Sequence, residues 1–269
     1  MRVSFRSRSA WLQLTMLVLV FIVNTLAVTL PINGYTPGAI SALFPNLFVP
    51  AGFTFSIWSV IYLLQTGYVI RSASVLEVPG HARNVPLKLR VQLTMPYFIG
   101  SSLLNVAWLF AWHYLQIGLS LLIMLALLLT LLALYRNLLK TDTAITGLDR
   151  LFLHTGFVVY LGWISVATIA NTTALLVYLQ WGGWGIEPAY WSTAMLLVAL
   201  LLAAFMSLYR HEMAFAAVIA WAAFGIYKAQ FVNSELVGYT AMAVAATALL
   251  LSGYAWWRRH SRTPLEGVI

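Results

Sequence analysis

The chain has 269 residues, of which 62% are hydrophobic and only 8% are charged. Soluble domains carry about a quarter charged residues, so this composition excludes a soluble globular protein, which must cover its surface with charge. The net charge of +8 does not indicate a nucleic-acid partner, because Lys and Arg stand in short runs between apolar blocks and provide no polar basic face.

The apolar residues form blocks that are long enough for membrane-spanning helices. About 20 residues cross ~30 Å of hydrocarbon as a helix, whereas the strands of an outer-membrane barrel are alternating segments of about 10 residues. We therefore expect an all-α fold, a polytopic transmembrane bundle of about eight helices. The expected spans are 11–30, 51–70, 93–114, 116–135, 151–178, 190–208, 212–231 and 236–257.

The first block follows three arginines, as the apolar region of a signal peptide would. It runs from Trp11 to Leu30, which is longer than the usual ~7–15 residues, and no small-x-small cleavage site follows it. We expect an uncleaved first span.

The boundary between the third and fourth spans is predicted at a polar, breakable turn near His113 and Gln116. On the other side of the bilayer from the charged loops, the Pro- and Gly-rich 31–50 segment is expected to be an ordered, partly membrane-buried loop. The 180–189 segment, which carries two tryptophans, is expected to be an interfacial turn.

The distribution of Lys and Arg tests the number of spans. With a cytoplasmic N-terminus, eight spans place these segments inside: 1–10, 71–92, 136–150, 209–212 and 258–269. These segments hold 14 of the 15 Lys and Arg residues, and only Lys228 lies near the outer side. Because basic loops stay in the cytoplasm, we expect an integral protein of the cytoplasmic (inner) membrane with both termini cytoplasmic.

Groups that could carry catalysis or bind a metal are scarce in the expected spans. Charged residues are nearly absent from the span centres, and neither an HExxH motif nor an Asp-rich site occurs. His113 and His154 are not spaced as a ligand pair, and the chain has no Cys. We expect no catalytic residue and no metal site, and hence no enzyme.

Amides and aromatic residues remain as candidate functional groups. Asn105 and Trp108 are i, i+3 neighbours on one helix face. A second stripe in the fifth span combines an indole, small residues and an amide: Trp163, Ala167, Ala170, Asn171 and Ala174. One interpretation is helix packing, in which small residues allow close approach and Asn bonds across the interface. The other is an aromatic-walled cavity with a few amide donors, which suits a flat apolar ligand.

The order of these motifs resembles the tryptophan-rich sensory protein / translocator protein family (TspO/MBR, peripheral benzodiazepine receptor-like), which has five transmembrane helices and a Pro-rich first loop. Pro45–Tyr62, PNLFVPAGFTFSIWSVIY, is similar to the family's KPxWxPPxxxFxxVWxxLY. Asn105–Phe110, NVAWLF, is similar to NxxWSxLFF of its third helix. Val159–Asn171, VYLGWISVATIAN, is similar to PYxxWxxFATxLN of its fifth helix.

The resemblance covers roughly residues 11–178. It implies a five-helix translocator-protein-like core in residues 1–178, followed in residues 179–269 by three additional transmembrane helices and a cytoplasmic tail. Most departures from the family pattern, at Phe44, Leu47 and the lone Pro50, fall in the loop that covers the family's pocket; Val159 stands for a proline of the fifth helix. They affect the expected ligand more than the expected fold.

In that family the ligand cavity lies inside the five-helix bundle and accepts porphyrins, sterols and synthetic aromatic amides. By motif position, Trp58 and Asn105 are implied to be the polar ligand contacts and Trp163 part of the wall. The whole implied ligand site consists of Trp58, Asn105, Trp108, Trp163, Ala167, Ala170 and Asn171. No cofactor is implied beyond a porphyrin or haem-like ligand, and the implied partners are the lipid bilayer, that hydrophobic small molecule and, as an open alternative, a second copy in a homodimer.

Three functions follow from these observations. The leading hypothesis is a sensor or carrier that binds a hydrophobic, tetrapyrrole-like small molecule. The first alternative is a secondary transporter or facilitator of a small apolar solute, which uses the last three helices to complete its transport unit. The second is a pigment-modifying enzyme, for which the sequence offers only Trp and Tyr as redox participants.

Overall fold

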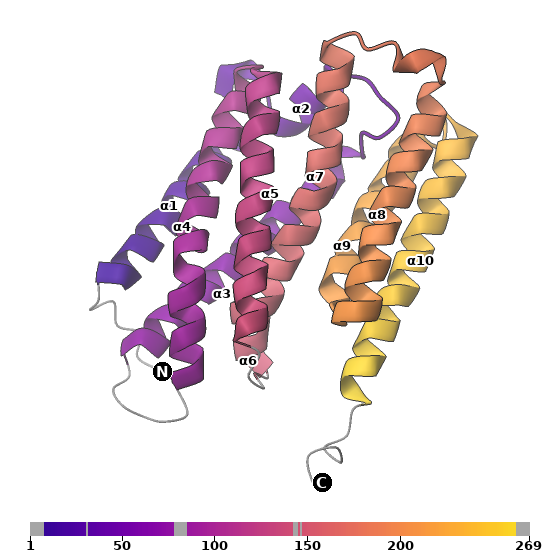
Figure 1. The fold of residues 1–269 in the computed structure, drawn as a ribbon. Coiled ribbons are helices and arrows are strands. Elements are labelled where there is room, and N and C mark those ends of the chain that lie inside the picture. The colour runs from indigo at the N-terminus through magenta and orange to yellow at the C-terminus, as the bar shows by residue number, and fades with distance from the viewer. Residues whose placement is uncertain (1–7, 31, 78–84, 142–144, 146, 262–269) are drawn as a thin grey trace. The chain divides into compact units, whose positions relative to one another are not determined.

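The computed structural model describes residues 8–30, 32–77, 85–141, 145 and 147–261. In this part of the chain the regular structure is helical (Figure 1), and eight helices are long and apolar enough to cross a membrane. The prediction of an all-α polytopic bundle is therefore confirmed. Some residues used in the charge analysis lie outside the described residues: Arg2, Arg6, Arg83 and Arg262.

The chain forms two compact units, of which the first comprises Met1–Phe44 and Phe55–Tyr178. Its long helices are α1 (Arg8–Thr29), α3 (Ile57–Glu77), α4 (Val85–His113), α5 (Ile117–Lys140) and α7 (Gly156–Tyr178). The short elements are η1 (Ile32–Gly34), α2 (Pro37–Ala42), α6 (Gly147–Arg150) and the π-helical turn η4 (Leu151–Thr155).

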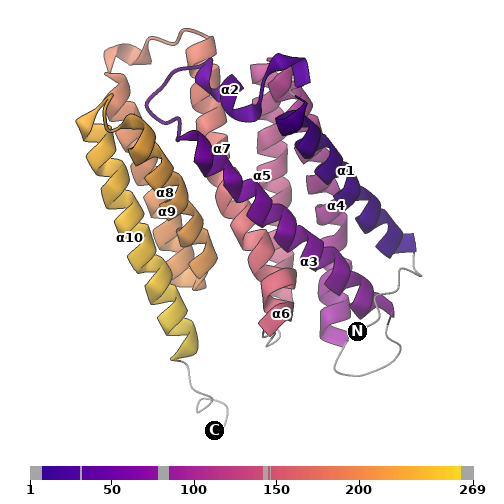
Figure 2. The same ribbon diagram turned by 180° about the vertical axis from the view of Figure 1, so that it is seen from behind.

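Helix α7 lies in the most buried of the eight spans and packs on α3, α5 and η4. Helix α4 lies along α5, α5 lies along α7, and α1 packs on α3 and α4. Helix α3 runs obliquely across the unit and contacts α1, α4 and α7 (Figure 2). Side chains at the start of α3 can therefore meet residues from several other helices.

The second unit comprises Pro45–Thr54 and Leu179–Ile269. Its helices are α8 (Pro188–Arg210), α9 (Met213–Gln230) and α10 (Glu235–His260), and each packs on the other two. The 3₁₀ turns are η5 (Gly183–Gly185) and η2 (Gly52–Ser56), which begins in this unit and leads into α3. Small buried residues line the helices, among them Ala216, Ala220, Ala223, Ala241, Ala245 and Ala248. Such residues let helix backbones approach closely, which replaces the hydrophobic effect as the driving force for packing in lipid.

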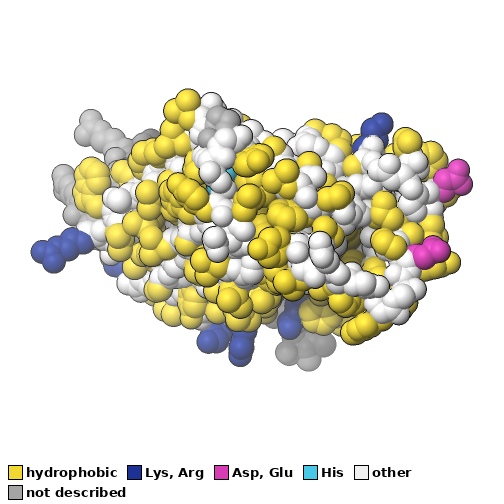
Figure 3. Space-filling view, turned by 90° about the horizontal axis from the view of Figure 1, so that it is seen from above, with side chains coloured by type: hydrophobic (Ala, Val, Ile, Leu, Met, Phe, Trp, Pro, Cys, Tyr) yellow, Lys and Arg dark blue, Asp and Glu magenta, His cyan; other side chains and the backbone are white. Residues whose placement is uncertain are grey.

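The turn between α4 and α5 lies where the sequence predicts it. Leu115 takes a left-handed conformation with φ 56°, and the Asn33 side-chain amide donates to the His113 carbonyl at 2.9 Å. Viewed from above, hydrophobic and other uncharged side chains cover most of the surface, and the Lys, Arg, Asp and Glu side chains in view lie toward its margins (Figure 3). Dividing residues 93–135 into two spans is thus confirmed.

The sequence-based division at residue 178 into a core and three additional helices stays a prediction. The structure adds one fact about this division. Residues Pro45–Thr54, which contain part of the first family-like motif, belong to the compact unit of α8, α9 and α10.

Candidate ligand site

Trp58, the second residue of α3, is the central residue of an aromatic cluster in the first unit. Its ring centroid lies 6.2 Å from that of Trp108 on α4, with 29° between the ring planes. It lies 6.1 Å from that of Trp163 on α7, which meets it edge-on at 84°. The structure therefore brings together three indoles that the sequence places on three separate helices.

The cluster contains two tyrosines that the sequence analysis did not single out. Tyr62 stacks on Trp58 at 5.6 Å, and Tyr160 meets Trp58 edge-on at 6.0 Å. Helical spacing could have identified both, since Tyr62 lies four residues after Trp58 and Tyr160 three residues before Trp163, which places each on the same helix face as its tryptophan.

The aromatic contacts continue along α4 toward α2. Trp108 and Trp112 stack at 6.0 Å with 19° between their planes, and Phe44 contacts Trp112 at 6.3 Å. The Trp112 indole N–H donates to the Pro37 carbonyl at 3.2 Å. Trp112 is thereby anchored, whereas the indole N–H groups of Trp108 and Trp163 find no acceptor among the residues that the structure describes.

Asn105 supplies the amide of the cluster. It is 1% exposed, and its Oδ1 accepts a hydrogen bond from Asn24 Nδ2 of α1 at 3.0 Å. The hydroxyls of Tyr62 and Tyr160 are further polar neighbours of this amide. One short polar group thus lies at the meeting point of α1, α3, α4 and α7.

Four buried polar atoms of the cluster make no hydrogen bond within the described part of the chain: Tyr62 Oη, Asn105 Nδ2, Trp108 Nε1 and Trp163 Nε1. A buried donor without an acceptor costs about 1–3 kcal/mol, and lipid cannot supply the acceptor. The cluster therefore combines aromatic faces with unused donors, which suits a flat molecule that carries acceptor atoms.

The other expected site residues of α7 lie farther along the helix. Asn171 is about 12 Å along the axis from Trp163, and its Oδ1 accepts from Ser120 Oγ of α5 at 3.1 Å. Ala167 and Ala170 are half-buried. Asn171 thus joins α5 to α7, as the packing interpretation requires, and a ligand role for Ala167, Ala170 or Asn171 stays a prediction.

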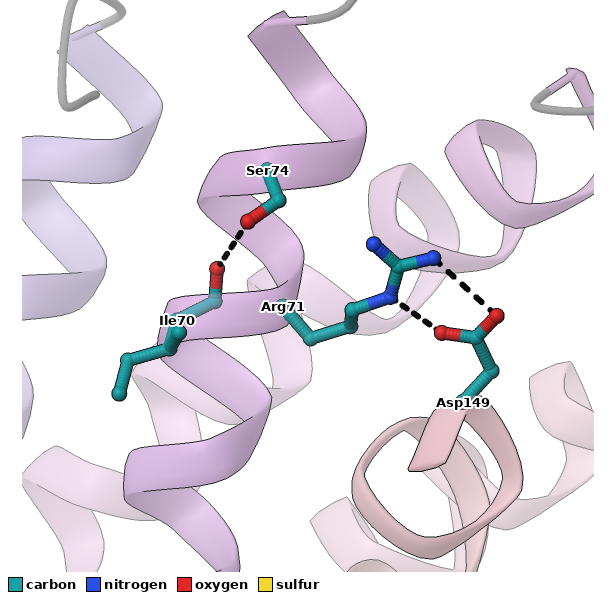
Figure 4. A network of polar contacts seen from close by, with 4 residues as sticks. All are labelled: Ile70, Arg71, Ser74 and Asp149. Atoms are coloured by element: carbon teal, nitrogen blue, oxygen red, sulfur yellow. Dashed lines mark hydrogen bonds and ion pairs between the residues drawn. The ribbon is translucent and has the colours of Figure 1, made fainter. Parts of the chain in front are cut away.

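At another place in the first unit, an ion pair joins α3 to α6 (Figure 4). Arg71 Nε and Nη2 face the two oxygens of Asp149, with 3.1 Å between Nη2 and Oδ2. Both side chains are 25% exposed. Two parallel bonds orient the guanidinium and carboxylate planes, so this pair fixes the angle at which the two elements meet.

Arg90, near the start of α4, is 1% exposed. Its Nη2 donates to the Thr141 carbonyl at 2.6 Å and its Nη1 lies 3.3 Å from His154 Nδ1. A cation at the carbonyl end of α5 is favourable because that end carries partial negative charge. Arg90 is therefore explained as a structural group that ties α4 to the end of α5 and to η4.

No group of three or more His, Cys, Asp or Glu residues that could hold a metal ion occurs among the residues with described positions. Comparison with family models matches residues 10–254 to the family described as TSPO-like protein. This match runs from α1 into α10 and so includes the last three helices. Neither the curated proteins nor the solved structures that were compared with the chain gave a match.

Proposed function

Because the chain belongs to the TSPO-like protein family, we propose that it binds a flat, hydrophobic, tetrapyrrole-like molecule and acts as a membrane sensor or carrier. The proposed site is the cluster of Trp58, Asn105, Trp108 and Trp163. The observation that supports this site most is the group of buried donors without acceptors beside the indole rings.

The indole rings favour a flat ligand because aromatic pairs gain about 0.5–1.5 kcal/mol beyond the burial of their surface. The ring of Trp58 contacts those of Trp108 and Trp163, so a ligand enters between them when one ring turns aside. Trp58 is the ring that moves in this proposal, since it is half-buried while Trp108 and Trp163 are 6% and 4% exposed.

The donors specify the polar part of the ligand. Asn105 Nδ2 and the indole N–H groups of Trp108 and Trp163 make no hydrogen bond with the described residues, so acceptor atoms of a ligand can pair with them. An unpaired carboxylate is expensive to bury, and none of the ring or hydrogen-bond contacts of the cluster involves Lys or Arg. The site therefore prefers a neutral acceptor such as a carbonyl or ester to a buried free carboxylate.

Titration of the purified protein with a porphyrin and with its methyl ester, followed by ligand absorbance, tests the proposal. Saturable binding is expected, and replacing Trp58 and Asn105 together by Ala should weaken it by at least about tenfold, which corresponds to 1.4 kcal/mol. Trp257→Phe is the matched control, because Trp257 is 54% exposed at the end of α10. Absence of saturable binding, or equal affinity of the double variant, would contradict the proposal.

Sensing and carriage differ in whether the ligand crosses the bilayer. The polar groups of the cluster are amides, hydroxyls and indoles, so passage would be facilitated diffusion without ion coupling. Flux of the porphyrin ester into proteoliposomes distinguishes the two functions, since a sensor binds it without flux.

We also propose a cytoplasmic-membrane location with both termini in the cytoplasm. The contacts of Arg71 with Asp149 and of Arg90 with Thr141 and His154 bring the basic ends of α3, α4, α5 and η4 together at one end of the first unit. Collection of basic residues at one end supports this orientation under the positive-inside rule.

A further inference from the structure

Residues Pro45–Thr54 run beside α9 in the second unit and bond to it through the main chain. The Ala51 N–H donates to the Gly225 carbonyl at 3.0 Å. The Trp221 indole N–H donates to the Thr54 carbonyl at 3.0 Å. An irregular segment at membrane depth needs partners for its backbone groups, and α9 provides them.

Gln230, the last residue of α9, adds a side-chain clamp. It is 6% exposed, and its Nε2 donates to the carbonyls of Val49 at 2.8 Å and Asn46 at 3.4 Å. Its Oε1 accepts from Asn233 Nδ2 at 3.0 Å, which fixes which end of the amide faces the segment. Both hydrogens of one amide group are thereby directed at one stretch of backbone.

Gly225 allows the segment to lie against the helix. A Cβ atom at this position would fall 2.0 Å from Thr54 Oγ1 and 2.9 Å from Thr54 Cγ2. Phe53 covers the same face of α9, with its ring 5.4 Å from Trp221 and 6.1 Å from Phe224. The segment can pack this closely on α9 only because Gly225 has no side chain. This glycine costs the helix about 1 kcal/mol relative to Ala.

The segment ends where the proposed ligand site begins. Thr54 is followed by Phe55, whose ring meets Trp163 edge-on at 6.1 Å. The turn η2 (Gly52–Ser56) leads directly into α3, and Trp58 is the second residue of that helix. The segment is therefore continuous in sequence with the helix that carries Trp58.

We propose that α9 positions the ligand site by holding the Pro45–Thr54 segment, with Trp221, Gly225 and Gln230 as positioning residues. This inference rests on the proposed function for its effect on ligand, and it assigns a role to one of the three helices beyond the five-helix core. Releasing the segment lets the Phe55–Trp58 turn sample other conformations, and apparent affinity falls with the fraction that remains competent to bind.

Two substitutions in the full-length protein test the clamp. Gln230→Glu keeps the size of the side chain but replaces the donor with an oxygen facing two carbonyls. Gly225→Ala favours the helix but forces Thr54 away. Each should weaken binding of the porphyrin methyl ester by about three- to tenfold, the range expected for loss of one or two hydrogen bonds.

Matched controls separate positioning from a loss of folding. Gly253→Ala in α10 has no atom within 4 Å of the added Cβ, so its affinity should equal that of the wild type. Adding Thr54→Ala to Gly225→Ala removes both atoms that lie closer than 3.0 Å and should recover most of the lost affinity. A merely unstable α9 would not be rescued by shortening a side chain on a different segment.

A second readout needs no ligand. The chain has no Cys, so Val49→Cys supplies one label site in the segment, at a half-buried position. Its reaction with a small maleimide should be faster when Gln230→Glu or Gly225→Ala is added, and unchanged with Gly253→Ala.

The outcomes distinguish the two proposals. Faster labelling with unchanged ligand affinity overturns the positioning role and leaves the proposed function standing. Equal labelling rates in all variants overturn the clamp itself. Absence of binding by the wild-type protein overturns the proposed function alone, because the labelling comparison still decides whether α9 holds the segment.

Discussion

Trp163 illustrates how a single atom can act in opposite directions on stability and binding. Its ring packs against Trp58 and Phe55, while its Nε1 has no acceptor within the described residues. The ring contributes to the fold in the absence of ligand. The N–H costs free energy until an acceptor arrives, and it then contributes to affinity.

Trp163→Phe removes the unpaired N–H, which should raise the free energy of unfolding by up to about 1–3 kcal/mol. The smaller ring loses packing contacts, which offsets part of this gain, so thermal stability should be unchanged or higher. The same change should weaken binding of the porphyrin ester. Thermal unfolding in detergent and ligand titration check the two effects. The control is Trp191→Phe, because the Trp191 N–H donates to the Gly183 carbonyl at 3.1 Å; its loss should lower stability without affecting affinity. Parallel losses of stability and affinity in Trp163→Phe would contradict this account.

The Arg71–Asp149 pair allows a smaller prediction at the residue scale. Because both side chains are a quarter exposed, solvent screening limits the pair to about 0.5–1 kcal/mol. Arg71→Gln should lower the free energy of unfolding by that amount, and the difference from wild type should shrink in high salt. Arg71→Lys should keep part of the stabilisation, because the positive charge remains. The rest should be lost, because an ammonium group lacks the paired donor geometry of guanidinium. A salt-independent loss would indicate packing instead of charge.

At the scale of elements, α3 and η4 approach each other at a glycine. A Cβ atom at Gly67 would fall 2.0 Å from Phe152 Cδ1 and 2.6 Å from its Cγ. Relieving this contact requires the whole ring or the backbone to move. The close approach connects α3 with the π-helical turn that precedes α7.

Gly67→Ala should lower the free energy of unfolding by about 1–3 kcal/mol through overpacking, against a gain of up to ~1 kcal/mol in helix propensity. Gly118→Ala in α5 is the control, because nothing lies within 4 Å of its added Cβ, and it should not destabilise. Adding Phe152→Ala should recover the steric part of the loss. Unfolding curves of the four proteins give the comparison, and equal stability of Gly67→Ala and Gly118→Ala would refute the steric explanation.

The elements themselves were largely predictable. Apolar block length located all eight spans, because each block must cover the hydrocarbon thickness. The sequence did not reveal the π-helical turn at Leu151–Thr155, where a plain helix from residue 151 was expected. The contact of Gly67 with Phe152 was also missed, since it pairs residues far apart in sequence and follows no helical period.

At the scale of the whole molecule, the absence of Cys makes topology directly measurable. Trp184 is 80% exposed in the turn η5 before α8, and His260 is exposed at the end of α10. In intact cells an impermeant maleimide should label Trp184→Cys but not His260→Cys, which should react after the cells are opened. The unmodified protein, which should not label, is the control. The reverse pattern would invert the proposed orientation.

The family and the motif order were also visible in the sequence, and the match over residues 10–254 confirms the resemblance. The candidate site was only partly predictable. Trp58, Asn105, Trp108 and Trp163 were singled out and the structure groups them, but their role as a ligand site stays a prediction. Tyr62 and Tyr160 were missed, although each lies about one helical turn from a tryptophan of the site.

By itself, the sequence determined that this chain is a helical membrane protein with eight candidate spans, because the bilayer imposes length and hydropathy on each segment separately. Only the tertiary structure decided which indoles meet at Trp58, and that Pro45–Thr54 packs on α9. Lipid is as apolar as the side chains, so no hydrophobic pattern marks the contacts between helices. Steric fit marks these contacts instead: Gly225 leaves room for the Thr54 side chain, and Gly67 leaves room for the Phe152 ring.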